Sequence, residues 1–440
     1  MIDRLEVLLF DRPTGQLAIA GPLRSPEDWT FRYHGDYLQS AAAVPMSVTL
    51  PLREDPYVGA VARNWFCNLL PEGAVRQAVV ERLRLPPDDD FALLAAIGGE
   101  CAGAVSVRVP GAVHAGASGS GGGQADLEED LDAVLGRQGA DAGEGAWALA
   151  GAPLRLSLAG AQDKLAVVVD AEGRLRLPRP GEASTHLLKP DSLRFPGIRD
   201  AEALGLALAR QVGLDAARAR LVEVAGRPAL LVERYDRIAA PDGSTCRLHQ
   251  EDLCQALGYP ERLKYEDRGG PGLADCSALL RRLALGPGAL NGLLDWVVFN
   301  ALIGNADAHA KNLSLLSDPQ GRRRLAPLYD LVPTIYLPES MVERTPAMRI
   351  GAATRIDRIG AQDWRAFAGA SRYAPGYVLK RVEGLADAVL ASLHVAGADI
   401  VAQGGREPRV ARMVEAVATN TRRIRDALHR DPGAAAAGVA

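Results

Sequence analysis

The chain has 440 residues, 48% apolar and 24% charged, which is ordinary for a globular protein with a large core and, at ~150 residues per domain, predicts two or three packed units. The formal net charge of -4 gives no global basic field, so nonspecific nucleic-acid binding is not expected. Five cysteines, an odd number without a CxxC pair, argue against a disulfide framework or a zinc site and favour a reducing compartment.

The first 110 residues are expected to form an α+β subdomain. "LEVLLF" and "LAIAG" are predicted strands around a PTG turn, and "AVARNWFCNLLPEG" has helical apolar spacing that ends near Pro71 and Gly73. Acidic residues within the first apolar run argue against a signal peptide, and no stretch approaches the ~20 apolar residues of a membrane helix. We therefore expect a cytoplasmic protein with no membrane partner.

A glycine-rich, acidic segment at 111–150 has the composition of a linker or insertion, and a small lobe is expected at 151–236. There "LRLSLAGAQDKLAVVVDAEGRLRLP" predicts strands around a glycine-containing loop, and "STHLLKPD" a further strand. "DAEALGLALARQVGL" predicts a helix with Asp200 as N-cap and Gly213 at its end. "ARLVEVAGRPALLVERYDR" predicts a hairpin around Gly226-Arg227-Pro228.

Residues 237–432 are expected to form a helical catalytic lobe, followed by a disordered tail at 433–440. Helices are predicted in "HQEDLCQALG", "CSALLRRLAL", "GALNGLLDWVVFNALIGN" and "PRVARMVEAVATNTRRIRDALHR". The last has an apolar stripe expected to face the core: Val410, Met413, Val414, Val417, Ile424 and Leu428. A β-rich lobe followed by a helical lobe is the order of a bilobal protein-kinase-like fold.

Asp307 and Asn312 lie five residues apart in "FNALIGNADAHAKNLSLL". Kinase catalytic loops use this separation, with an aspartate that accepts the substrate hydroxyl proton and an asparagine that binds a metal ion. Asp330 in "LAPLYDLVPT" can supply a second hard oxygen to Mg2+. Taken alone, each also fits a turn or capping residue, and Asn305 has no predicted role beyond a turn.

Three earlier segments could bind a nucleotide. In "SLAGAQDK", residues 157–164, small residues let backbone N–H groups approach phosphate oxygens. A strand follows and the GK[ST] ending is missing, which argues against a Walker A loop. Lys189 could pair with the α/β-phosphates, with Glu202 as its ion-pair partner. An ordinary hairpin loop and a solvated strand end are the alternatives.

"LLVERYDR", residues 230–237, occupies the place of a kinase hinge. Its backbone could contact the adenine edge, Tyr235 could flank the ring, and Glu233 or Asp236 could bind the ribose. A surface salt-bridge cluster is the alternative. The order of these segments along the chain, more than any one of them, favours a kinase.

These motifs, with "KYEDRGGPG" and the N-terminal "PMSVTLPL", "NWFCNLLPEG" and "GGECAGAVSV", resemble HipA-type serine/threonine kinases, the toxins of bacterial type II toxin–antitoxin pairs. The resemblance covers most of the chain. It implies that Asp307 is the catalytic base, that Asn312 and Asp330 bind magnesium, and that Ser157 is autophosphorylated. It further implies that ATP contacts Ala159, Gly160, Ala161, Gln162, Asp163, Lys164, Lys189, Glu233, Arg234, Tyr235, His309, Ala310, Lys311, Asn312, Tyr329 and Asp330.

The resemblance also implies partners: a helix-turn-helix antitoxin (HipB-like), operator DNA through the antitoxin complex, and a protein substrate among the aminoacyl-tRNA synthetases, with glutamyl-tRNA synthetase as the first guess. Two alternatives stay open at this point. One is a small-molecule phosphotransferase of the same fold, such as an aminoglycoside kinase. The other is a catalytically silent corepressor.

Overall fold

The computed structural model describes residues 2–21, 25–111, 162–179, 181–192, 194–239 and 245–429. The chain divides into two compact units. Unit 1 comprises Met1–Pro196, Val222–Arg262 and Ser314–Ala326, and unit 2 comprises Gly197–Leu221, Leu263–Leu313 and Pro327–Ala440. The predicted linker beyond Gly111, the loop residues up to Ala161 and the predicted tail lie outside the described residues.

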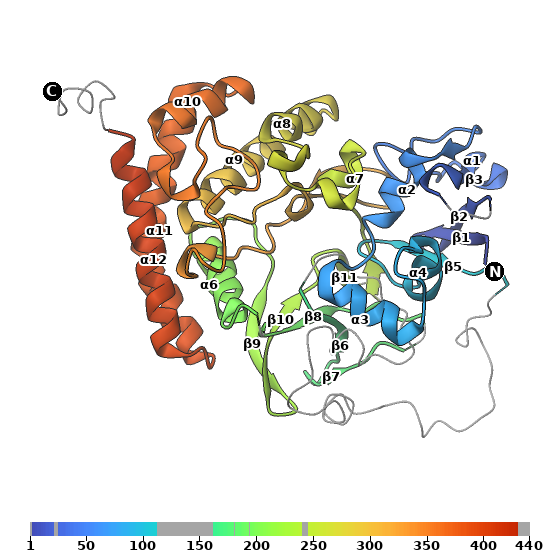
Figure 1. Ribbon diagram of the computed structural model, residues 1–440, viewed down its shortest axis with the longest axis horizontal. Helices are drawn as coiled ribbons and strands as arrows, with labels where there is room; N and C mark the ends of the chain where they lie inside the picture. Colours follow the sequence, from blue (N-terminus) through green and yellow to red (C-terminus); the bar gives the residue numbers. More distant parts are fainter. Residues whose placement is uncertain are drawn as a thin grey trace. The chain divides into compact units, whose positions relative to one another are not determined.

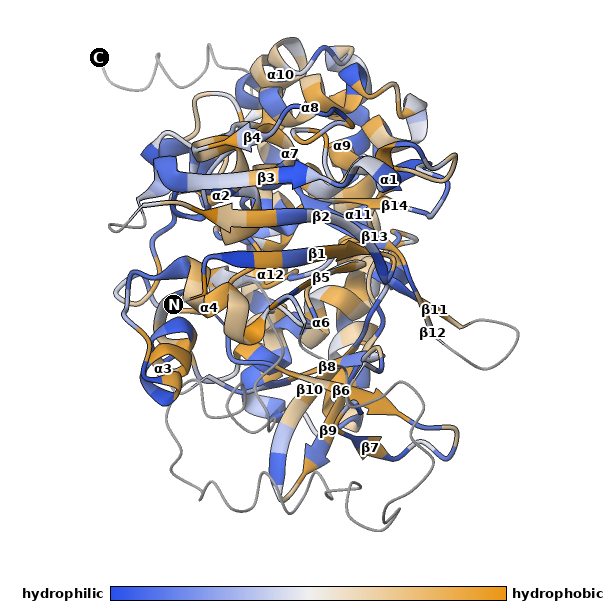
Figure 2. Ribbon diagram, turned by 90° about the vertical axis from the view of Figure 1, so that its right-hand side faces the viewer, coloured by the Kyte–Doolittle hydropathy of each residue, from blue (hydrophilic) through white to orange (hydrophobic). Residues whose placement is uncertain are grey.

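Unit 1 begins with an antiparallel five-stranded sheet in the order β4-β3-β2-β1-β5, of which Figure 2 shows β1, β2 and β3 side by side. The strands are β1 (Arg4–Leu9), β2 (Arg12–Ile19), β3 (Trp29–Tyr33), β4 (Tyr57–Val58) and β5 (Val105–Arg108). The turn between the first two strands was predicted at the wrong residues. Phe10 and Asp11 form it in left-handed conformation, at φ 53 and 59°, and the PTG sequence lies inside β2.

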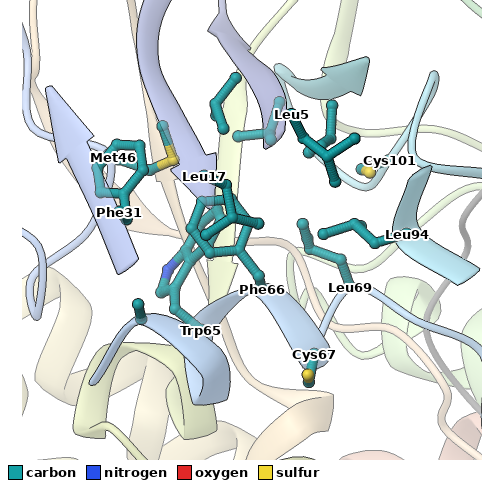
Figure 3. Close-up of a cluster of buried hydrophobic side chains, with 14 of the residues drawn as sticks. Leu5, Leu17, Phe31, Met46, Trp65, Phe66, Cys67, Leu69, Leu94 and Cys101 are labelled. Carbon is teal, nitrogen blue, oxygen red and sulfur yellow. The ribbon is translucent and has the colours of Figure 1, made fainter. Parts of the chain in front are cut away.

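Four helices accompany this sheet: α1 (Gly35–Leu38), α2 (Ala60–Cys67), α3 (Gly73–Leu83) and α4 (Asp90–Ile97). Trp65 and Phe66 of α2 are fully buried against strand residues such as Leu17 and Phe31 (Figure 3). The predicted helix is confirmed, although it ends at Cys67, and Gly73 begins the next helix rather than ending this one.

A second five-stranded sheet of unit 1 has the order β7-β6-β8-β10-β9 (Figure 1). Its strands are β6 (Leu165–Val169), β7 (Leu175–Arg176), β8 (His186–Pro190), β9 (Ala219–Val224) and β10 (Arg227–Glu233). The predicted strand over "STHLLKPD" and the β9–β10 hairpin are confirmed. The hairpin turn is Ala225-Gly226, where both residues have positive φ.

Unit 1 ends with short strands: β11 (Arg237–Ala239), β12 (Thr245–Arg247), β13 (His249–Asp252), β14 (Ser314–Ser317) and β15 (Arg323–Leu325). "HQEDLCQALG" was predicted as a helix, but its first half is β13 and only α7 (Leu253–Leu257) is helical. The break falls at Asp252, which forms a capping box with Gln255.

Unit 2 contains α6 (Ile198–Gln211), α8 (Leu273–Arg282), α9 (Gly286–Ile303), α10 (Ala361–Ala370), α11 (Pro375–Ala402) and α12 (Glu407–Ala427) (Figure 1). The helix predicted from Asp200 begins earlier, with Gly197 as N-cap. Asp200 is not the cap, because its fully buried carboxylate pairs with Arg199 at 2.8 Å. The stripe predicted for α12 is buried except Leu428, which is half-buried at the helix end.

Helix α11 was not among the predicted helices. Of the described helices it alone is long and apolar enough to cross a membrane by length and composition, which corrects the expectation that no segment approaches this. Its buried residues, such as Val382 and Leu393, lie where it packs with α6, α9, α10 and α12. A core helix passes the same test, so this finding is weak evidence for a membrane span.

Candidate functional site

The candidate catalytic loop, residues 305–312, starts where α9 ends. Gly304 adopts the left-handed conformation at φ 69°, and a Cβ there would meet the side chain of Ile335. All residues of the loop are buried except Asp307, which is exposed. A buried backbone with one exposed carboxylate is the arrangement expected of a group that must meet a substrate.

Asn305, for which the sequence suggested only a turn, connects the two candidate acidic residues. The carboxamide is 2% exposed. Its Oδ1 accepts the N–H of Asp307 at 3.1 Å, and its Nδ2 donates to Asn300 Oδ1 at 2.8 Å. The same Nδ2 lies 3.4 Å from the carbonyl oxygen of Asp330. Both candidate acidic residues therefore share one backbone frame.

Asn312 is oriented by the loop itself. Its Nδ2 donates to the carbonyl of Asp307 at 3.2 Å, and the N–H of His309 donates to the same carbonyl at 2.9 Å. Oδ1 of Asn312 is thus the atom suited to a metal ion. The hydroxyl of Tyr329 donates to the carbonyl of Lys311 at 2.6 Å and so joins the loop to the residue preceding Asp330.

Asp330 has a strained backbone, with φ at 50° in a residue that carries a side chain. Leu328, two residues before Asp330, is fixed by two backbone hydrogen bonds of 2.8 Å: its N–H donates to the Asp215 carbonyl, and its carbonyl accepts the N–H of Ala217. The following Leu331 lies against α6, where a Cβ on Gly205 would collide with its carbonyl oxygen. Strain supported from both sides is typical of a functional position.

The donor set of unit 2 fits magnesium. Mg2+ prefers a few oxygen ligands and takes the rest from phosphate and water, and Asn312 Oδ1 with the Asp330 carboxylate would supply such oxygens. Among the described residues no group of three or more His, Cys, Asp or Glu side chains is placed to bind a metal.

The candidate phosphate-binding part lies in unit 1. The antiparallel register that pairs Leu165 with Leu188 places Lys164, one residue before β6, opposite Lys189 of β8. Opposite residues of an antiparallel pair point to the same face of the sheet. Lys189 is only 4% exposed. Lysine side chains at these two opposite positions are of the type that binds the phosphates of a polyphosphate anion.

Several residues of the predicted hinge already form contacts within unit 1. Glu233 is exposed, and Tyr235 packs against the small apolar cluster of Leu248, Leu316 and Ala326. Arg234 has its N–H bonded to the carbonyl of Thr185 at 2.9 Å, and its side chain lies in a buried ion cluster. The N–H and the side chain of Arg234 are thus already engaged, and the predicted contact with ATP would involve its carbonyl.

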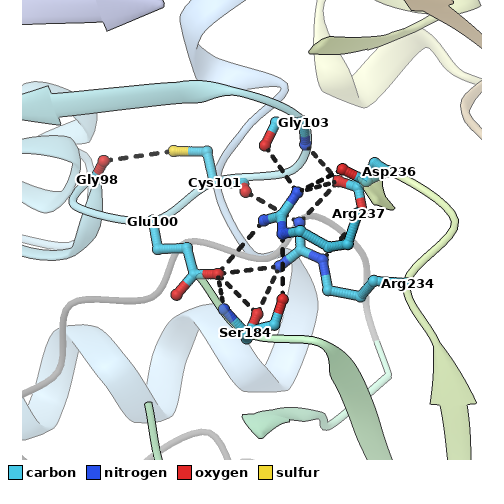
Figure 4. Close-up of polar contacts among 8 residues, drawn as sticks. All are labelled: Gly98, Glu100, Cys101, Gly103, Ser184, Arg234, Asp236 and Arg237. Carbon is cyan, nitrogen blue, oxygen red and sulfur yellow. Dashed lines mark hydrogen bonds and ion pairs between the residues drawn. The ribbon is translucent and has the colours of Figure 1, made fainter. Parts of the chain in front are cut away.

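That ion cluster joins the N-terminal subdomain to the hinge segment (Figure 4). Oε1 of Glu100 accepts the hydroxyl of Ser184 at 2.6 Å and lies 3.3 Å from both Arg234 and Arg237. Asp236 pairs with the same arginines at 2.8 and 2.9 Å. Burial opposes ionisation of both acids, yet the arginines outweigh it and hold their pKa values below the ordinary range.

Asp236 is therefore not a ribose ligand, and that part of the sequence hypothesis was wrong. Its carboxylate is 4% exposed and also accepts the N–H of Gly103 at 2.7 Å. Glu233 remains the candidate. The sequence analysis did not assign a role to Glu100 in "GGECAG". Its arginine partners, Arg234 and Arg237, lie 134 and 137 residues further along the chain, so no local pattern could indicate the pairing.

The other predicted residues are placed as follows. Ser157, Ala159, Gly160 and Ala161 lie outside the described residues; Gln162 is half-buried and Asp163 is 9% exposed; Ala310 and Lys311 are buried. Glu202 is buried in α6 of unit 2, while Lys189 belongs to unit 1, so their pairing stays a prediction.

Comparisons with known proteins find matches over most of the chain. Residues 5–108 match the model of the HipA N-terminal domain, and residues 156–394 that of the HipA-like C-terminal domain. A candidate kinase of Sinorhizobium fredii, Y4mE, is 40% identical over 369 residues, 82% of this chain and 84% of the relative. The serine/threonine-protein kinase toxin HipA of Shewanella oneidensis is 30% identical over 351 residues, 74% of each chain.

A solved structure also matches. A chain in the complex of HipA, HipB and operator DNA from Shewanella oneidensis superposes with a TM-score of 0.79 at 26% identity, over 96% of this chain and 99% of that chain. The α+β, kinase-like fold expected from the sequence is thereby confirmed.

Proposed function

The chain belongs to the HipA family, and from this premise we propose that it is a Mg-ATP-dependent protein serine/threonine kinase that acts as the toxin of a toxin–antitoxin pair. One observation carries the proposal. The buried carboxamide of Asn305 bonds to the backbone of Asp307 and lies at the carbonyl of Asp330, so a candidate base and a candidate metal ligand are fixed in one frame.

In this proposal Asp307 accepts the proton of a serine hydroxyl on the target. The serine oxygen bonds to the γ-phosphorus while the bond to the β-phosphate oxygen breaks, and ADP leaves. Asn312 and Asp330 would hold Mg2+, which neutralises the charge on the transferred phosphoryl group. Lys164 and Lys189 would bind the phosphates, with His309 and Lys311 as further contacts. Glu233 and Tyr235 would contact the adenosine.

Regulation and partners are part of the same proposal. A phosphate on Ser157 would add about -2 charge beside the phosphates of ATP, so autophosphorylation there would silence the kinase by repulsion. The partner proposed is a HipB-like antitoxin that joins the kinase to operator DNA, supported by the match to a HipA chain solved with HipB and its operator. The substrate proposed is an aminoacyl-tRNA synthetase, glutamyl-tRNA synthetase first, in the cytoplasm.

The test uses the full chain with Mg2+ and radiolabelled ATP, and follows phosphate incorporation into the protein itself and growth of cells that express it. Asp307→Ala and Asp330→Ala should each lower the rate by several orders of magnitude, because phosphoryl transfer depends on positioning and charge stabilisation. Asp387→Ala is the matched control, since this aspartate is exposed and pairs with Arg425 at 3.1 Å. Variants that stay active and toxic would contradict the proposal.

Two further measurements separate the alternatives. Mass spectrometry that places the phosphate on Ser157 favours the toxin over a small-molecule phosphotransferase. Calorimetry that detects no Mg-ATP binding to the dephosphorylated protein would favour a silent corepressor. A phosphoproteome of cells that express the wild type or Asp307→Ala would then identify the target.

A further inference from the structure

The segment 263–270 of unit 2 is fixed beside the candidate catalytic loop by a relay of backbone hydrogen bonds. The N–H of Glu266 donates to the carbonyl of Ala347 at 2.9 Å, and the N–H of Ala347 donates to that of Ala306 at 2.9 Å. The carboxylate of Glu266 accepts the N–H of Arg349 at 2.6 Å. Residue 306 directly precedes Asp307, so the position of the segment is coupled to that of the candidate base.

The two glycines of "KYEDRGGPG" let this segment turn tightly. Gly269 adopts a left-handed conformation at φ 87°. A Cβ on Gly270 would collide with the carbonyl oxygens of Leu263 and Tyr265, while its N–H donates to the Tyr265 carbonyl at 2.9 Å. This hydrogen-bonded turn fixes the backbone of Tyr265 and thereby the direction of its side chain.

The side chain of Tyr265 contacts the site at both ends. Its hydroxyl donates to Oδ1 of Asp307 at 2.8 Å. Its ring lies edge-on to the ring of His309, with centroids 5.4 Å apart and an interplanar angle of 82°. The Lys264 ammonium and the Arg268 guanidinium lie 5.4 and 5.1 Å from the ring centroid, which favours this ring position through cation–π attraction.

We propose that Tyr265 is a positioning residue for phosphoryl transfer. Because its hydroxyl engages Oδ1 of Asp307, the carboxylate has a fixed orientation and Oδ2 is presented to the substrate hydroxyl. Positioning of this kind accounts for much of the rate in reactions that depend on near-attack geometry. The inference rests on the proposed kinase function and adds a residue outside the catalytic loop to it.

The opposite role is also physically possible. A hydroxyl on the catalytic carboxylate could occupy the place of the substrate serine and so block the base. The two roles predict changes of opposite sign when the hydroxyl is removed, which makes them separable by one substitution.

The first test is Tyr265→Phe in the full chain, measured as the rate of radiolabelled phosphate incorporation into the protein over a range of ATP concentrations. The rate at saturating ATP should fall about tenfold, since a hydrogen bond to a charged group is lost, while the ATP concentration for half-maximal rate stays unchanged. Tyr373→Phe is the matched control, because its hydroxyl donates to the Leu290 carbonyl at 2.7 Å. It should leave both quantities unchanged.

The second test is Tyr265→Leu, which also removes the ring from His309. Here the half-maximal ATP concentration should rise in addition to the fall in rate. A Tyr265→Phe variant as active as the wild type, or more active, would overturn the proposal, the latter outcome indicating a blocking residue. If the wild type itself incorporates no phosphate, the kinase function fails before Tyr265 is tested, so the two failures are distinguishable.

Discussion

Replacing Glu100 by glutamine should destabilise unit 1 and disturb the predicted hinge. In the native cluster Glu100 and Asp236 pair with Arg234 and Arg237, the charge of Arg247 also acts on Glu100, and the Glu100 side chain is 7% exposed. The substitution removes the negative charge from the pairs that Glu100 forms with Arg234 and Arg237, each at 3.3 Å, and leaves these buried arginines with one carboxylate fewer. Breaking a buried ion pair from one side costs about 3 to 5 kcal/mol. Because the glutamine side-chain oxygen can still accept the Ser184 N–H, a loss of stability at the lower end of this range is expected.

The assay is urea unfolding followed by circular dichroism, combined with the ATP dependence of phosphate incorporation. The half-maximal ATP concentration should rise because Arg234 lies between Glu233 and Tyr235, the residues that would contact the adenosine. Glu172→Gln is the control, since Glu172 pairs with Arg174 at 3.3 Å on an exposed surface. A Glu100→Gln variant no less stable than this control would refute the reasoning, because the cluster would then be open to water.

Three further predictions concern a buried acid, the Asn305 carboxamide and two helix glycines. Burial raises the pKa of Glu251 from 4.5 to about 7, so the protonated side chain contributes to stability below pH 4.5 and this contribution is lost as the pH rises through about 7. The free energy of unfolding in urea should therefore fall between pH 5 and 8, and Glu251→Gln should abolish this fall. Asn305→Ala should cost about 2 to 3 kcal/mol in urea unfolding and lower the kinase rate, because it orphans the Asp307 N–H and its Asn300 partner. Gly205→Ala should destabilise although alanine favours helices, since its Cβ meets the Leu331 carbonyl, whereas Gly384→Ala, with open space around it, should stabilise α11 by about 0.5 to 1 kcal/mol in thermal or urea unfolding.

Elements with a local signal were predicted well. Helix α9 and the stripe of α12 follow from apolar periodicity, β8 follows from a short apolar run, and the β9–β10 hairpin from two apolar runs around a glycine turn. Where two local signals competed, the prediction failed. Asp200 resembled an N-cap but lies in the first turn of α6, where burial against Arg199 outweighs capping propensity.

The candidate base and metal ligands could be proposed from the sequence because kinase chemistry fixes their spacing. The residues that support them could not. Glu100 meets Arg234 across 134 positions, and Tyr265 meets Asp307 across 42. Such pairs depend on tertiary packing, and a single sequence contains no record of it.

Asn305 shows why support is harder to predict than chemistry. Its turn position was evident from the sequence, but a turn asparagine usually bonds to its own backbone neighbours. Here one bond is local, to Asp307, and the other contacts reach Asn300 in α9 and the carbonyl of Asp330, 25 positions away. The candidate site thus depends on a carboxamide that bonds to Asn300 and to the backbone on either side of the site. Substitutions of Asn305 and Tyr265 should therefore lower the kinase rate by changing the position of the Asp307 carboxylate while leaving that carboxylate in place.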